Sequence, residues 1–189
     1  MITKQEIFEG IYAAWQLLLG NRDAVKLFDD SVRGFWKSFF AAVIVFPIYT
    51  LLIVIGAIDF KTTHGLFSLV LLNIEFYIIG WVLWPLIFGY IVPVLDRSEK
   101  YTLYIVVYNW ANVIGATAFL ITIIASEILP LGQGFGALLI GMVTLGLLAY
   151  HVFLSRVALD IPLGAAVGLV IGEFVLGQIL LIVQQGVSM

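Results

Sequence analysis

The sequence predicts an all-α polytopic membrane protein, in which five transmembrane helices follow one or two amphipathic interfacial helices. Its composition is 62% hydrophobic and 11% charged, and its mean hydropathy is +1.12, which is far from the balance of a soluble domain. Between residues 65 and 95, Glu75 is the single charged side chain. We therefore divide the chain into cytoplasmic amphipathic helices over residues 1–36 and a transmembrane bundle over residues 37–189.

Residues 3–19 are predicted to form an amphipathic helix that lies in the membrane interface. Thr3 and Glu6 have the spacing of a capping box, in which each side chain accepts a hydrogen bond from the other residue's amide, so the helix should begin at Thr3. Apolar residues then recur on one face at helical spacing, namely Ile7, Phe8, Ile11, Tyr12, Trp15, Leu18 and Leu19.

A second amphipathic helix is expected after Asn21, whose side chain can cap it. Its apolar stripe consists of Val25, Phe28, Val32, Phe35 and Trp36. Opposite charges lie four residues apart in the pairs Lys26 to Asp30 and Asp29 to Arg33, a spacing at which they can meet. We interpret this charged surface as solvated; a docking surface for a cytosolic partner is the alternative.

Five apolar stretches are long enough to cross a bilayer as helices. They cover approximately residues 39–58, 66–95, 101–125, 135–157 and 163–183. At about 1.5 Å of rise per residue, the second stretch exceeds the hydrocarbon layer, so it must tilt, protrude, or kink at Pro85 or Pro93. Pro162 lies near the first position of the last helix, where its missing amide does no harm.

The basic residues predict the orientation of the chain. Lys61 alone lies on one side of the predicted spans. The other side carries Lys4, Arg22, Lys26, Arg33, Lys37, Arg97, Lys100 and Arg156. Because Lys and Arg concentrate in cytoplasmic loops, the N-terminus should be cytoplasmic, and five crossings place the C-terminus on the opposite side.

Four polar residues within the last three spans are expected at a similar depth: Asn109, Asn112, His151 and Glu173. An ionised carboxylate inside a bilayer costs several kcal/mol, so Glu173 should be protonated or paired. We expect the four to form an intramembrane polar cluster, either as a hydrogen-bonded network that fixes helix register or as a proton or ion relay. Glu75 should reach the outer interface, where it needs no partner.

Small residues recur at every fourth position of the last span, at Gly164, Gly168 and Gly172. This spacing clears one helix face so that another backbone can approach closely. Ala111 and Gly115 repeat the spacing on the third span, which makes that span the expected partner within the chain. A homo-oligomer joined through the glycine face is the alternative.

The sequence lacks the patterns of catalytic and cofactor-binding proteins. It contains zero cysteines and two histidines, too few for a thiolate or clustered metal site. No phosphate-binding loop, zinc-protease motif, nucleophile elbow or dinucleotide-binding glycine pattern is present. A net charge of -3 without a basic run argues against nucleic acid. We predict no enzyme activity, cofactor or metal, and the lipid bilayer as the main partner.

Two loose sequence patterns resemble the Yip1 family of membrane proteins. One is the charged turn at residues 96–100 that leads to Tyr-Asn-Trp-Ala at 108–111, and the other is the segment 150–159 followed by Ala-Ala at 165–166. The resemblance covers roughly residues 37–184. It implies five spans, a cytoplasmic N-terminus, and a location in the bacterial inner membrane. In eukaryotes such proteins are implicated in vesicle trafficking through binding of Rab-type GTPases.

Three functions are consistent with these observations. A Yip1-like protein that organises membranes or binds proteins is the main expectation, with the amphipathic N-terminus as its contact surface. A small transporter or channel that uses the intramembrane polar cluster is the second, and an accessory subunit of a larger membrane complex is the third. A water-filled cavity that reaches Glu173 would favour transport, whereas a dry bundle with an extended exposed groove would favour protein binding.

Overall fold

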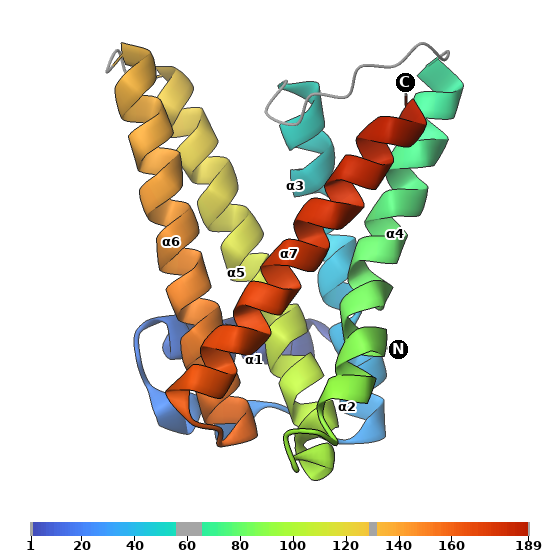
Figure 1. The fold of residues 1–189 in the computed structure, drawn as a ribbon. Helices are drawn as coiled ribbons and strands as arrows, with labels where there is room; N and C mark the ends of the chain where they lie inside the picture. Colours follow the sequence, from blue (N-terminus) through green and yellow to red (C-terminus); the bar gives the residue numbers. More distant parts are fainter. Residues whose placement is uncertain (1, 56–65, 129–131, 189) are drawn as a thin grey trace.

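The computed structural model describes residues 2–55, 66–128 and 132–188, and within these ranges it is helical without strands (Figure 1). Five segments in the described ranges are long and apolar enough to cross a membrane, which confirms the predicted all-α polytopic membrane fold. The elements are α1 (Lys4–Leu18), η1 (Arg22–Leu27), α2 (Val32–Ser38), α3 (Phe40–Val54), α4 (Leu66–Ile91), η2 (Ser98–Lys100), α5 (Tyr101–Ile128), α6 (Gly132–Leu159) and α7 (Leu163–Ser188).

The helices differ from the predicted spans mainly at their ends. Helix α4 ends at Ile91 rather than at residue 95, because Pro93 disfavours helical backbone at the residue before it. Pro85, in contrast, remains inside α4. Helices α5, α6 and α7 extend beyond their predicted limits at the end remote from α1. The end of the first predicted span, residues 56–58, lies outside the described residues.

Helix α1 runs across the other helices near one end of the bundle (Figure 1). Its capping box forms as predicted, with Glu6 N–H donating to Thr3 Oγ1 at 3.2 Å and Thr3 N–H donating to the Glu6 carboxylate at 2.8 Å. The buried face differs from the predicted apolar stripe, because it consists of the small residues Gly10, Ala13 and Ala14 together with Leu17. The larger residues of the stripe remain exposed, and we call Phe8, Tyr12, Trp15 and Leu19 the outer face of α1.

The second N-terminal segment is not one continuous helix. Asn21 caps η1 by accepting from Asp23 N–H, as predicted, but η1 ends at Leu27 and a new helix begins at Val32. Lys26 pairs with Asp23 at 2.6 Å, one turn back, instead of with Asp30. Helix α2 crosses the predicted domain boundary at residue 36, and it forms one apolar segment with α3 over Val32–Val54.

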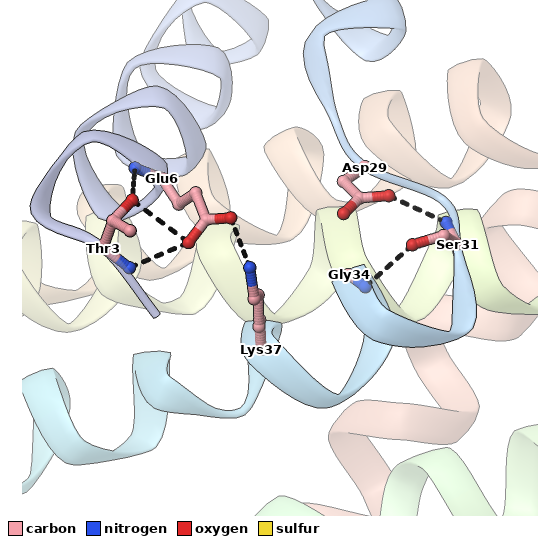
Figure 2. A network of polar contacts seen from close by, with 6 residues as sticks. All are labelled: Thr3, Glu6, Asp29, Ser31, Gly34 and Lys37. Atoms are coloured by element: carbon pink, nitrogen blue, oxygen red, sulfur yellow. Dashed lines mark hydrogen bonds and ion pairs between the residues drawn. The ribbon is translucent and has the colours of Figure 1, made fainter. Parts of the chain in front are cut away.

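The start of α2 is fixed by local polar contacts (Figure 2). Ser31 Oγ accepts from Gly34 N–H at 3.1 Å, and Asp29 accepts from Ser31 N–H at 3.1 Å. A side chain at Gly34 would meet the Asp29 carbonyl oxygen at 2.0 Å, so this close approach requires glycine. Asp29 thereby serves this turn, rather than the predicted pair with Arg33.

A hydrogen-bonded ion pair joins α1 to α2, since Lys37 Nζ donates to the carboxylate of Glu6 (Figure 2). The same carboxylate accepts from the backbone and the hydroxyl of Thr3. Lys37, and after it Thr3, lowers the pKa of Glu6 from 4.5 to about 2. The capping box of α1 is therefore also its electrostatic link to α2.

The bundle opens toward the end that is remote from α1 (Figure 1). We call the end that carries α1, α2 and the turns after α4 and α6 the basal end, and the opposite end the distal end. Helices α5 and α6 form one arm, while α3 and α4 lie on the other side. Helix α7 starts beside α6 at the basal end and reaches α4 at the distal end, so it connects the two arms diagonally.

The hydrophobic core occupies the basal half of this arrangement. The main buried cluster includes α4 only from Trp84 onward, α5 only as far as Val113, and α6 only from Tyr150 onward. Helix α5 is the central element, because 44% of its most apolar stretch is buried, against 17% in α4, α6 and α7. The basal half is thus closely packed, whereas the distal half leaves space between the arms.

Arg97 holds the two basal turns together. Its Nε donates to the Leu159 carbonyl at 3.0 Å and one terminal nitrogen donates to the Asp160 carbonyl at 3.2 Å. Asp160 directly follows α6 and Asp96 lies in the turn after α4, both in left-handed conformations, with φ of 52° and 54°. The guanidinium therefore satisfies carbonyl groups that the end of α6 leaves free.

Candidate functional site

A central cavity of about 500 Å³ lies between the two arms. Residues from all five long apolar helices line it, from Tyr108 and His151 on the basal side to Phe76 and Gln184 on the distal side. Glycines at positions 80, 115 and 177 contribute to the wall, and a side chain at Gly177 would meet no atom within 4 Å. The space therefore arises where helices diverge and where small residues face each other.

His151 and Glu173 meet across α6 and α7, with Nδ1 and Oε2 3.4 Å apart. Both side chains are largely enclosed, at 12% and 17% exposure. They come together because His151 lies near the basal end of α6 and Glu173 lies in the first half of α7, and the turn at Asp160 reverses the chain between them. The structure thus provides the partner that a carboxylate in this position requires.

The His151–Glu173 pair separates two cavities. His151 lines the central cavity, and both residues line a second cavity of about 180 Å³ between α5, α6 and α7. Phe119 and Leu147 also belong to both walls. His151 is therefore accessible from both cavities, whereas Glu173 is accessible from the second cavity.

Tyr108 and Asn112 complete the basal wall of the central cavity. The ring of Tyr108 contacts His151 edge to face, with centroids 5.7 Å apart. The amide of Asn112 donates to the Tyr108 carbonyl oxygen at 3.1 Å, one turn back along α5. Of the four residues predicted to form a polar cluster, Asn112, His151 and Glu173 thus line the two cavities.

Asn109 is not part of this wall, although its spacing from Asn112 predicted a shared face. It is completely buried and donates to Ser38 Oγ at 2.8 Å, so it joins α5 to the end of α2. Asn109 and Asn112 are three positions apart, so their side chains point in directions that differ by about 60° around the helix axis. In a packed core this angle is enough for the two amides to contact different neighbours. Asn109 is a structural contact between helices.

A second polar group lies at the distal side of the central cavity, and sequence reasoning missed it. Asn73 Oδ1 accepts from Tyr49 Oη and from Gln184 Nε2, each at 3.2 Å, which joins α3, α4 and α7. Asn73 and Gln184 are buried. The available signal was an asparagine inside an otherwise apolar span, and such a residue needs a partner in lipid.

The glycine face of α7 does not pack as predicted. A side chain at Gly164, Gly168 or Gly172 would meet no atom within 4 Å, so no other helix approaches these positions closely. Gly168 and Gly172 instead line a groove of about 250 Å³ beside α4. On α5, Ala111 is buried in the core, and Gly115 faces Leu147 of α6.

Within residues 2–55, 66–128 and 132–188, no three His, Cys, Asp or Glu side chains lie close enough to hold a metal ion. The fold and the site together define an all-α polytopic membrane protein with a cavity between its helices. No family model, curated protein or solved structure matches the chain.

Proposed function

We propose that the protein binds a small amphipathic molecule in the central cavity, as the binding step of transport across or within the membrane. The observation that carries this proposal is the cavity of about 500 Å³ that ends at His151, whose partner is Glu173. Cavities of this size are typical of sites for small ligands. Apolar helices supply most of the wall, while His151, Asn112 and Gln184 supply polar contacts at two ends.

The basic residues support an orientation for this site. Lys61 lies outside the described residues, and the other eight of the nine Lys and Arg lie on α1, η1, α2, η2 or the turns and helix ends at the basal side. We infer from this asymmetry that the basal end is cytoplasmic and that the cavity lies toward the opposite side. In a bacterium this membrane would be the inner membrane.

The proposal is tested by asking what the purified protein carries. The full chain is extracted in a mild detergent, and native mass spectrometry measures bound small molecules. Gly177→Leu is the variant, because its side chain would fill the cavity without meeting protein atoms at the Cβ position. Gly134→Leu on α6 is the matched control, since its position is open but does not line either cavity.

A bound molecule is expected on the unaltered protein and on Gly134→Leu, and its occupancy should fall in Gly177→Leu while helicity and melting temperature are unchanged. Equal occupancy in all three proteins would contradict the proposal, and so would the absence of any bound molecule.

A second candidate function is the Yip1-like organisation of membranes or binding of proteins, and the exposed residues of α1 and α2 favour it. The outer face of α1 and Trp36 of α2 expose large apolar side chains, with Phe8 and Trp36 each at 69%. Such a surface suits the interfacial layer of a membrane. Loss of membrane deformation or of protein recruitment in Phe8→Ser and Trp36→Ser, with ligand occupancy unchanged, would favour this candidate over transport.

A further inference from the structure

The charges around the two neighbouring cavities restrict what they can bind. Among the described residues that line them, none is Lys or Arg, and Glu173 supplies a carboxylate. When Glu173 is ionised and His151 is neutral, the pair carries one negative charge in a largely buried position between apolar helices. A charge in such a place is stabilised by a cation and destabilised by an anion, because water screens it poorly.

The apolar wall of the central cavity is rich in aromatic rings. Its lining includes Tyr49, Phe76, Tyr77, Trp81, Tyr108 and Phe119. The face of an aromatic ring attracts positive charge, and this attraction increases where water is excluded. Aromatic walls also provide apolar surface, so the same residues fit both the hydrocarbon part and the charge of a lipophilic cation.

The two amide groups at the wall each make one hydrogen bond within the protein. The Asn112 amide donates to the Tyr108 carbonyl oxygen, and the Gln184 amide donates to Asn73. An anionic ligand would find no Lys or Arg among the described lining residues and would lie near the carboxyl group of Glu173. A quaternary cation, in contrast, requires no hydrogen-bond donor from the protein.

We propose that the central cavity takes a lipophilic organic cation, an apolar amine or an onium ion, whose positive centre lies against His151 and the surrounding rings. This inference rests on the binding function proposed above and adds the chemical class of the ligand. Glu173, whose carboxyl oxygen lies 3.4 Å from His151 Nδ1, provides charge complementarity from behind the imidazole, and the aromatic rings provide the remaining contact surface.

The test compares two ions of nearly the same shape and opposite charge, tetraphenylphosphonium and tetraphenylborate. The chain has zero cysteines, so a single introduced thiol reports on one position. Ala116→Cys places it on the cavity wall, and Ala118→Cys, two residues further along α5, lies outside the lining. Each full-length variant is placed in vesicles of neutral phospholipid, and the rate of labelling by N-ethylmaleimide is measured with and without each ion.

Tetraphenylphosphonium should slow labelling of Ala116→Cys at least about tenfold at saturation. It should leave Ala118→Cys unaffected, and tetraphenylborate should slow neither. In the Ala116→Cys background, Glu173→Gln should weaken the protection by tetraphenylphosphonium about tenfold or more. Glu75→Gln is the matched control, because Glu75 is an exposed carboxylate on α4 outside both walls, and it should change nothing.

Phe119→Leu provides a second variant that keeps the carboxylate and an apolar side chain but removes a ring. It should weaken protection by the cation, and it decides the question if Glu173→Gln fails to fold. Equal protection by the two ions, or stronger protection by the borate, would overturn the inference that the ligand is a cation. The proposed function, binding of a small molecule in the central cavity, would still stand. Protection by neither ion would overturn the inference, and the native mass spectra then decide the proposed function separately.

Discussion

The basal and distal halves of the bundle share the five long apolar segments but differ in how closely their helices pack. In the basal half, α1 lies across α5 so closely that a side chain at Gly10 would meet Trp110 at 2.4 Å. In the distal half, a side chain at Gly177 would meet nothing within 4 Å. Small residues inside a membrane thus permit close packing only where a bulky neighbour fills the space they leave. Elsewhere the same residue type leaves a cavity.

The largest effect is expected from Gly10→Ala. The added carbon would overlap the buried indole of Trp110, and overpacking of this kind costs about 3 kcal/mol of unfolding free energy. Gly177→Ala should instead be neutral or stabilising by up to about 1 kcal/mol, because alanine is the better helix former. Unfolding of both variants in mixed detergent micelles measures the difference. Equal destabilisation would show that the two halves pack alike.

Arg97→Ala should have the next largest effect. It removes two charge-assisted hydrogen bonds to carbonyl groups at the end of α6, and hydrogen bonds to charged groups are worth about 1.5–3 kcal/mol. Arg97→Lys keeps the charge but cannot reproduce the planar fork, so it should recover less than half of the loss. Full recovery by lysine would mean that charge alone holds the basal turns. The same unfolding measurement applies.

A smaller difference in unfolding free energy is expected between variants that remove a partner of the buried amides of Asn109 and Asn73. Ser38→Ala leaves the Asn109 amide without its partner in a site that is 0% exposed, at a cost of about 1–2 kcal/mol. Tyr49→Phe in the distal half leaves Asn73 still accepting from Gln184, so about 0.5–1 kcal/mol is expected. A greater loss of unfolding free energy in Tyr49→Phe than in Ser38→Ala would contradict the expectation that the basal half is the more tightly packed.

The smallest effect concerns the link between α1 and α2 and depends on pH. Lys37, and after it Thr3, lowers the pKa of Glu6 from 4.5 to about 2 in the folded protein, so the stabilisation is fully present above pH 4.5 and is lost as the pH falls toward 2. The melting temperature of the unaltered protein should exceed that of Glu6→Gln at pH 6. This gap should close between pH 4.5 and 2, and a gap independent of pH would contradict the assignment.

The fold class could be predicted from the sequence because apolar runs of about 20 residues are typical of transmembrane helices. The approach of His151 to Glu173 also agrees with their expected depth, since depth follows from distance along each span. The separation of Asn109 from Asn112 could not be predicted. It depends on how α5 is rotated against its neighbours, and hydropathy contains no information on rotation within a nearly uniformly apolar helix.

The face of α1 that contacts the bundle was not predicted. The apolar stripe was expected to face the membrane interface, and its large residues Phe8 and Trp15 are exposed. Gly10, Ala13 and Ala14 make the contact with the bundle. In lipid, large side chains gain little by leaving the surface, whereas small ones allow close approach. The hydrogen-bonded group on the distal side of the central cavity was not predicted either. Tyr49 and Gln184 belong to it only because both donate to Asn73, which lies on a different helix from each of them.

The docking of α1 has a consequence for biosynthesis. Tyr150 Oη donates to the Ala14 carbonyl oxygen at 2.8 Å, and the two residues are 136 positions apart. The ribosome therefore releases α1 long before α6 exists, and the helix must wait without its partner. Its aromatic outer face can hold it at the bilayer surface during that interval. Helix α1 thus reaches its final contact with α6 only after residues more than a hundred positions later have been translated.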